Sequence, residues 1–242
     1  MKLKSQIPNL FTLLNLFSGC IAAIYIIKND FDKAFLFVIL GITFDFFDGF
    51  LARLLKVESP LGVQLDSLAD MVTSGFVPGL AMVYLLKKSF ISLDFQSEYL
   101  EYFSWFGFVI TLASCFRLAV FNVSNNQSSS FIGLPTPSSA LVVLSIGMIY
   151  QLNEIEILSE IFSNTIFLIL ITIFLAYLMN SKVNLFALKF KNFSFYDNKL
   201  QYIFIGIVLI LLFLLQRNAV PFIIFSYIIL SILFFRVNEK KS

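Results

Sequence analysis

Long apolar runs dominate the chain, and short polar or proline-containing stretches separate them. Eight runs approach the roughly 20 apolar residues that a membrane-spanning helix needs. They cover about 7–27, 34–55, 63–86, 102–122, 135–152, 164–181, 201–215 and 220–236. The last two runs predict a tight hairpin that turns at Gln216–Ala219. The pattern as a whole predicts an all-α bundle of about eight transmembrane helices. We expect residues 1–242 to form a single integral-membrane domain, with an uncleaved first helix.

Composition supports this class and excludes several kinds of chemistry. Hydrophobic residues make up 59% of the 242 residues and charged residues 13%, about half of the charged share in soluble domains. A net charge of +2 is too small for a nucleic-acid footprint, so no nucleic-acid partner is expected. Histidine is absent, which excludes a Ser-His-Asp triad, a His-ligated haem and histidine proton relays. Any general base must be a carboxylate, Lys, Tyr or Cys.

The basic residues predict how the helices are oriented. If the N-terminus lies in the cytoplasm and eight helices cross the membrane, most of the 17 Lys and Arg residues fall on the cytoplasmic side. The residues on the outer side are then Lys28, Lys33, Lys87, Lys88 and Arg217. Positive charge is enriched in cytoplasmic loops. We therefore expect a multi-pass protein of the inner or plasma membrane, with both termini in the cytoplasm.

Four carboxylates lie inside the second and third predicted helices, where charged groups are expensive and usually functional. Asp45 and Asp48 are three residues apart, and Asp66 and Asp70 are four apart, so each pair shares one helix face. The short link at residues 56–61 should make the two helices antiparallel neighbours. All four carboxylates then converge near the cytoplasmic end.

Such a cluster needs cations. At 4 Å, two like charges repel by about 4 kcal/mol at an effective dielectric constant of 20. Two hard cations bridged by carboxylates form a phosphoryl-transfer site, and Mg²⁺ or Mn²⁺ suits ligands that are all oxygen. The pattern predicts two divalent cations held by the four aspartates.

Small and basic residues accompany the carboxylates. Gly49, Ala52 and Gly62 have no bulk, so a flat base or a diphosphate can approach the helix backbones. Arg53 offers a positive fork for a phosphate oxygen. Alone, the small residues would indicate close helix packing, and Arg53 would indicate an interfacial anchor. Beside four aspartates they indicate a binding site.

The spacing of these residues carries a family resemblance. Residues 45–70 match the signature D-x2-D-G-x2-A-R-x8-G-x3-D-x3-D at every fixed position, and in this the chain resembles the CDP-alcohol phosphatidyltransferase family. The resemblance implies that Asp45, Asp48, Asp66 and Asp70 hold two divalent metals and that Asp70 is the base for the acceptor hydroxyl. It also implies that CDP-diacylglycerol is bound by Asn15, Gly49, Ala52, Arg53 and Gly62. A homodimer is expected by the same analogy.

Three further stretches resemble the phosphatidylserine synthase branch of that family. They are residues 7–19 around Asn15, residues 116–122 with Arg117 and Asn122, and residues 131–140 with Gly133, Pro135 and Pro137. By resemblance, the last five residues contact the acceptor or a lipid phosphate. Without the resemblance, Arg117 would be a snorkelling side chain at a helix end and the prolines would mark a helix start.

The resemblance implies transfer of a phosphatidyl group from CDP-diacylglycerol to L-serine at a site near the cytoplasmic face, among membrane lipids. A sister enzyme that uses glycerol 3-phosphate, inositol or another alcohol is the nearest alternative. A cation-coupled transporter would also place acids in the membrane, but it predicts acids spread along a path. A scaffold protein without activity is the third alternative, and the intact motif argues against it.

Overall fold

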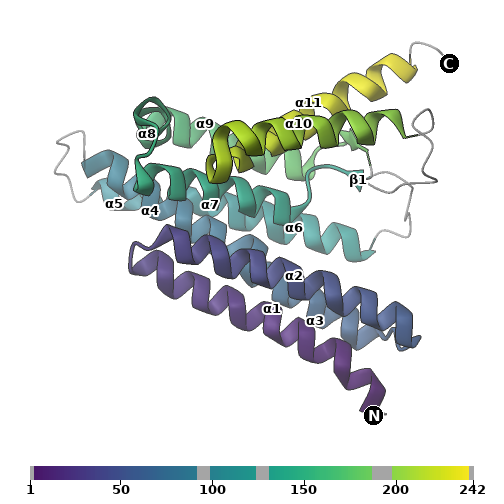
Figure 1. Cartoon of the computed structure of the whole chain (residues 1–242). Helices are drawn as coiled ribbons and strands as arrows, with labels where there is room; N and C mark the ends of the chain where they lie inside the picture. The colour runs from purple at the N-terminus through teal and green to yellow at the C-terminus, as the bar shows by residue number, and fades with distance from the viewer. Residues whose placement is uncertain (1–2, 92–98, 124–130, 187–197, 240–242) are drawn as a thin grey trace.

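The computed structural model describes residues 3–91, 99–123, 131–186 and 198–239, and this part of the chain is almost entirely helical (Figure 1). The first half contains α1 (Leu3–Ile27), α2 (Phe31–Leu55), α3 (Pro60–Asp70), the π-helical turn η1 (Met71–Phe76), α4 (Val77–Ile91), α5 (Tyr99–Ser104), the 3₁₀ turn η2 (Trp105–Phe108) and α6 (Val109–Val123). The second half contains β1 (Phe131–Ile132), α7 (Thr136–Leu152), α8 (Glu156–Ser163), α9 (Thr165–Asn180), β2 (Asn184–Leu185), α10 (Lys199–Leu215), the 3₁₀ turn η3 (Gln216–Ala219) and α11 (Val220–Glu239).

All eight apolar runs predicted from the sequence are helical. The predicted hairpin near the C-terminus is confirmed, because η3 occupies its turn and rings of α10 and α11 meet: the centroids of Phe204 and Tyr227 lie 5.6 Å apart. The short helix α8, the two-residue strands that pair as β1–β2 and the π turn were not predicted.

By length and apolar character, five helical stretches of the described chain qualify as membrane spans, or six if the bent pair α8–α9 is one span. The five are Gln6–Ile27, Phe31–Leu55, Pro60–Ile91, Tyr102–Val123 and Lys199–Phe235. The last stretch contains the α10–α11 hairpin, and α7 is a shorter apolar helix. The protein is therefore a helical multi-pass membrane protein, and the count of eight crossings stays a prediction.

Local sequence signals explain where α2 and α3 begin and end. The side chain of Asp30 accepts a hydrogen bond from the Lys33 amide at the start of α2, and Lys56 ends this helix in the left-handed conformation. Ser59 caps α3 through the Gly62 amide, and Pro60 occupies the first helical position, where its missing N–H costs nothing. A short, well-capped link therefore joins the two helices that carry the aspartates.

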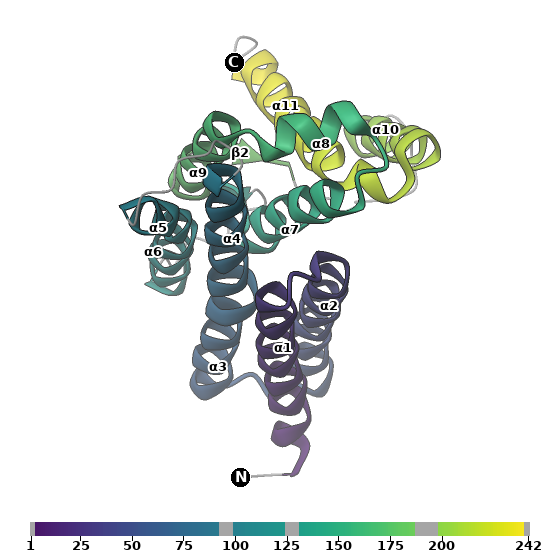
Figure 2. The ribbon, with the colours of Figure 1, turned by 90° about the vertical axis from the view of Figure 1, so that its left-hand side faces the viewer.

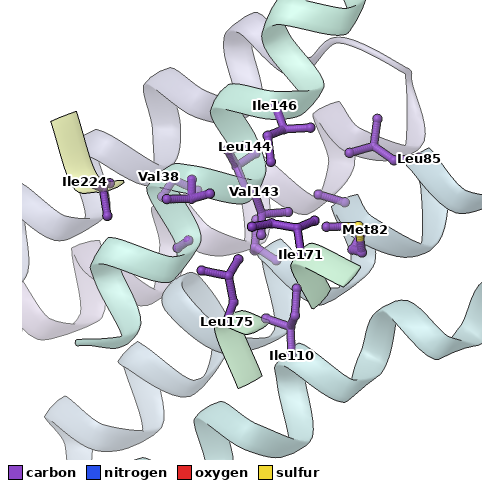
Figure 3. Close-up of a cluster of buried hydrophobic side chains, with 14 of the residues drawn as sticks. Val38, Met82, Leu85, Ile110, Val143, Leu144, Ile146, Ile171, Leu175 and Ile224 are labelled. Carbon is purple, nitrogen blue, oxygen red and sulfur yellow. The ribbon is translucent and has the colours of Figure 1, made fainter. Parts of the chain in front are cut away.

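The hydrophobic core surrounds α7, which packs against α2, α4, α8 and α11. Eight consecutive residues of α7, 142–149, are buried. Figure 3 shows Val143, Leu144 and Ile146 among side chains from neighbouring helices. A helix enclosed by protein on all sides is apolar all round, which explains why α7 has no polar face.

The α1–α2 hairpin lies beside this core, and α1 rather than α2 is the main neighbour of α3 (Figure 2). The expected direct pairing of α2 and α3 is thus replaced by an arrangement in which α1 contacts both. Their carboxylates approach one another beside α1.

The bundle has two chemically different ends. The acidic half contains Asp45, Asp48, Asp66 and Asp70. The turn end is defined by Asn29, Lys88, Gln151, Glu154 and Arg217, which contact one another across the turns after α1, α7 and α10 and the last residues of α4. Helix α1 begins and α11 ends on the side away from these turns (Figure 1), as an even number of crossings requires.

Candidate active site

The aspartates of α2 and α3 come together as the sequence predicts. Asp45, Asp48 and Asp66 each offer a carboxylate oxygen, and these oxygens lie within 4.8 Å of one another. Asp48 is buried, with 6% of its surface exposed, and Asp45 and Asp66 are half-buried. Asp70 adjoins this cluster beside Asp45. Four carboxylates from two helices thus share one site.

The donor atoms fit a hard divalent cation. One oxygen of Asp66, Oδ1, is buried and has no hydrogen-bond partner among the described residues. A buried oxygen without a partner costs about 1–3 kcal/mol, and an all-oxygen ligand set is what Mg²⁺ and Mn²⁺ prefer. Among the described residues, no ion pair reaches the four aspartates. The chemistry of the cluster therefore agrees with a metal site.

Helix α1 supplies the neutral partners of two of these carboxylates. The Thr12 hydroxyl donates to Asp48 Oδ2, with 2.5 Å between the oxygens. The Asn15 amide donates from Nδ2 to Asp70 Oδ1 at 3.1 Å. Thr12 and Asn15 are three residues apart on one helix face, and both are buried. Sequence reasoning selected Asn15 but missed Thr12, which the same helical spacing from Asn15 would have revealed.

The π turn η1, which follows Asp70 directly, is anchored to α1. Thr73 donates from Oγ1 to the backbone oxygen of Asn15 at 3.0 Å. A Cβ atom at Gly19 would lie 2.4 Å from Thr73 Oγ1, and one at Gly41 would lie 2.7 Å from Thr73 Cγ2. Two glycines therefore let α1, α2 and η1 meet at one buried threonine. π turns recur at functional sites, and this one follows Asp70 directly.

The other motif residues line the side of the cluster near the α2–α3 link. The Arg53 guanidinium lies over Gly49, since a Cβ there would be 3.4 Å from Arg53 Nη1. Ala52 is half-buried one residue before Arg53. Gly62 lies beside Asn9 of α1, whose Oδ1 would be 3.7 Å from a Cβ at that glycine. The structure thus brings these residues next to the aspartates, and their contacts with a nucleotide stay a prediction.

The Arg117 side chain of α6 forms hydrogen bonds with backbone carbonyl oxygens. It donates from Nη1 to the carbonyl oxygens of Ile132 (3.1 Å) and Met179, and from Nη2 to that of Gly133 (3.2 Å). Gly133 has a φ of 71°, and a Cβ there would lie 2.6 Å from Arg117 Nη1. Only glycine fits this conformation beside the guanidinium. Arg117 therefore ties the segment before α7 to the end of α9.

The remaining predicted residues fall around the same helices. Asn122 donates from Nδ2 to the Ser67 hydroxyl at 2.8 Å, which places it against α3 next to Asp66. Pro135 is the N-cap residue of α7, and Pro137 lies in the first turn of this helix. Their roles in acceptor or phosphate binding stay predictions.

Comparisons with known proteins agree with this geometry. Residues 5–178 match the family model described as CDP-alcohol phosphatidyltransferase. The chain is 30% identical over 181 residues to a CDP-diacylglycerol–serine O-phosphatidyltransferase of Bacillus subtilis, covering 74% of this chain and 89% of the relative.

Two relatives of the same name match over shorter regions. The one from Helicobacter pylori is 35% identical over 139 residues, 57% of this chain and 55% of that protein. The one from Saccharomyces cerevisiae is 34% identical over 159 residues, 59% of this chain and 53% of that protein. The chain thus spans just over half the length of these two relatives. Because the family match covers α1 to α8, nearly all of α9 and the complete aspartate cluster, the chain belongs to the CDP-alcohol phosphatidyltransferase family.

Proposed function

We propose that the protein transfers the phosphatidyl group of CDP-diacylglycerol to L-serine and so forms phosphatidylserine and CMP. The convergence of Asp45, Asp48, Asp66 and Asp70 carries the phosphatidyl-transfer part of the proposal. The names of the relatives from Bacillus, Helicobacter and yeast support serine as the acceptor.

The residues of the site have different roles in this reaction. Asp45, Asp48, Asp66 and Asp70 hold two divalent cations, Mg²⁺ or Mn²⁺. Bound there, the cations neutralise the diphosphate and the charge that develops on its oxygens. Arg53 and the small surfaces of Gly49, Ala52 and Gly62 receive the CDP part of the donor. Asn15 serves the donor site through Asp70, the carboxyl that it contacts.

Asp70 is the general base. It takes the proton of the serine hydroxyl, the oxygen attacks the phosphorus that carries the diacylglycerol, and the phosphoanhydride bond to CMP breaks. The Asn15 amide holds one oxygen of Asp70, so the carboxyl keeps a fixed direction.

The observations do not favour the alternatives equally. A sister enzyme with another alcohol shares the whole aspartate site, so the acceptor must be tested directly. A transporter would need acids along a path, whereas these four carboxylates occupy one cluster.

An acceptor panel tests the proposal. The purified full chain receives labelled CDP-diacylglycerol, Mn²⁺ or Mg²⁺, and serine, glycerol 3-phosphate, inositol or ethanolamine in turn, and the lipid product is identified. We expect phosphatidylserine as the main product. Faster transfer to glycerol 3-phosphate or inositol would contradict the choice of serine but not the transfer reaction.

We further propose that both termini and the site face the cytoplasm of a cell whose inner or plasma membrane holds the protein. The turn end contains Lys88 and Arg217, two of the few basic residues expected on the outer side, and the enrichment of positive charge in cytoplasmic loops supports this orientation. A cytoplasm-active reporter fused after Ser242 should work and a periplasm-active reporter should not. A homodimer is proposed by analogy with the family, and the molar mass in detergent tests it.

A further inference from the structure

Two buried hydroxyl groups near the active site have no hydrogen-bond partner in the part of the chain that the structure describes. Ser74 of η1 and Ser139 of α7 are both 0% exposed, and the Oγ atom of each makes no hydrogen bond within the structure. Buried polar groups almost always have a partner, because leaving one unpaired costs about 1–3 kcal/mol. Unpaired hydroxyls in a well-packed region therefore point to a ligand that is polar itself.

Contacts near the turn end place these two serines at the same depth. The Phe31 ring contacts α4 through Tyr84, with 6.3 Å between ring centroids, and it contacts α7 at Gly147. Further along, Lys88 Nζ lies 5.5 Å from the ring centroid of Tyr150. The contacts move from Tyr84 to Lys88 along α4 and from Gly147 to Tyr150 along α7. Residue numbers thus increase in the same direction in both helices, so α4 and α7 run parallel.

Counting residues back from these contacts gives the register of α4 and η1 against α7. Ten residues before Tyr84 is Ser74, and ten before Gly147 is Pro137 in the first turn of α7. The π turn η1 packs against α7, so the two elements are still in contact at that depth. Side chains of a helix point toward its N-terminus, which directs Ser139 toward the same first turn. The register therefore puts Ser74 at the level of the first turn of α7, the turn that contains Ser139.

The first turn of α7 suits a negatively charged group. Its N-cap residue, Pro135, supplies no side-chain hydrogen bond to the helix. A helix of 17 residues presents about half a positive charge and unpaired amides at such an end. Two serine hydroxyls next to it add neutral donors. These N–H and O–H donors can bind a small anion, and a carboxylate has the charge and the two acceptor oxygens that suit them.

The place of this group relative to Asp70 matches an amino acid. Ser74 is four residues after Asp70, in the π turn that follows it directly, so the two residues lie within one turn of each other. Only two carbon atoms separate the hydroxyl of serine from its carboxylate carbon. An acceptor serine can therefore present its hydroxyl to Asp70 while its carboxylate lies near Ser74.

Arg117 gives this site its rigidity. Three backbone carbonyls occupy its guanidinium, two of them in the segment that leads into α7. It therefore acts on the first turn of α7 through the backbone and leaves the carboxylate to other donors.

We propose that Ser74 and Ser139, together with the first turn of α7, bind the carboxylate of the amino-acid acceptor. This inference rests on the proposed function and specifies how that enzyme selects serine over alcohols that lack a carboxylate.

Steady-state kinetics of the full chain in detergent or liposomes test the inference. The unmodified protein is measured first with CDP-diacylglycerol, Mn²⁺ and serine. Ser74→Ala and Ser139→Ala should each raise the KM for serine about tenfold or more, since a hydrogen bond to a charged group is worth about 1.5–3 kcal/mol. The KM for CDP-diacylglycerol should not change. Thermal stability should not fall, because neither hydroxyl has a protein partner to lose.

Ser145→Ala is the matched control. Ser145 lies in the same helix, is also 0% exposed, and donates to the Val142 oxygen at 2.8 Å. Its replacement should lower stability slightly and leave the KM for serine unchanged. Ser139→Cys, which keeps the size and a weak donor, should fall between the wild type and Ser139→Ala.

The outcomes separate the two proposals. If the unmodified chain forms no phosphatidylserine, the proposed function fails. If it does, but both alanine variants keep the normal KM for serine, the hydroxyls do not contact the acceptor and this inference is wrong. An equal rise in the KM of serine and donor would also overturn it, because a carboxylate site acts on the acceptor alone.

Discussion

The turn end and the acidic half both contain many polar groups, but these groups differ in how they are paired. At the turn end, Gln151 accepts from the Phe31 amide and donates to the Asn29 oxygen, Lys88 donates to the Asn29 side chain, and Arg217 pairs with Glu154 at 3.4 Å. Opposite charges and complementary amides hold the turns together there.

The acidic half brings together side chains of like charge. Three carboxylates lie within 4.8 Å, a fourth adjoins them, and one oxygen of Asp66 is buried without a partner. Repulsion of about 4 kcal/mol for each close pair makes this arrangement unfavourable for stability by itself. The difference indicates that the turn end contributes to stability, and that the acidic half is the part of the molecule where our proposal places cations and substrate.

Removal of divalent metal should have the largest effect, and only on the acidic half. EDTA should abolish transfer, because among the described residues no ion pair offsets the repulsion between the four aspartates, and Mn²⁺ or Mg²⁺ should restore it. Added Mn²⁺ should also raise the melting temperature of the metal-free protein, and much less so in Asp66→Asn. Full activity in a rigorously metal-free preparation would refute the two-metal site.

Asp70→Asn should have the second largest effect on transfer. Loss of a general base should lower turnover by a factor of about 10²–10⁴, while the variant folds and still binds CDP-diacylglycerol. Single-turnover transfer and a donor-binding assay measure the two properties separately. Near-normal turnover would show that another group takes the proton.

Arg117→Ala should have an intermediate effect. The change leaves three backbone oxygens unpaired and loosens the segment that leads into α7. Because a small misplacement of a binding group can cost up to about a hundredfold, we expect the KM for serine to rise about tenfold or more. The KM for the donor should rise far less. A shift of the donor KM alone would contradict this positioning role of Arg117.

Thr12→Val should have a smaller effect on the metal site. The variant keeps the shape but removes the hydrogen bond to Asp48, so the Mn²⁺ concentration for half-maximal activity should rise about tenfold or less. Thr12→Ser should restore it. Thr172→Val is the control, because Thr172 is equally buried and bonds only within its own helix. If both valine variants behave alike, Thr12 has only a packing role.

Changes at the turn end should affect catalysis least. Gln151→Ala removes the partner of two backbone groups and should lower stability by about 1–3 kcal/mol with turnover nearly unchanged. Arg217→Ala should cost less, because exposed ion pairs contribute about 0–1 kcal/mol. A tenfold loss of turnover in the folded Gln151→Ala protein would mean that the two ends are coupled.

Much of this architecture follows from the sequence alone. Apolar runs of membrane length and the short link at residues 56–61 predict the helices and the α2–α3 link, because hydropathy and link length are local properties of the chain. The spacing of Asp45, Asp48, Asp66 and Asp70 predicts the cluster, because helical geometry alone puts each pair on one face. The same spacing shows the family.

Tertiary structure decided which partners those groups meet. Three features depend on contacts between residues 32 to 58 positions apart. Helix α1 lies against both aspartate helices, Thr12 donates to Asp48, and the π turn places Thr73 between Gly19 and Gly41. The carbonyl partners of Arg117 and the unpaired hydroxyls of Ser74 and Ser139 likewise arise only from packing. Hydrogen-bond pairing is set by where helices cross, and crossing points depend on the fit of whole surfaces rather than on the spacing within any one helix.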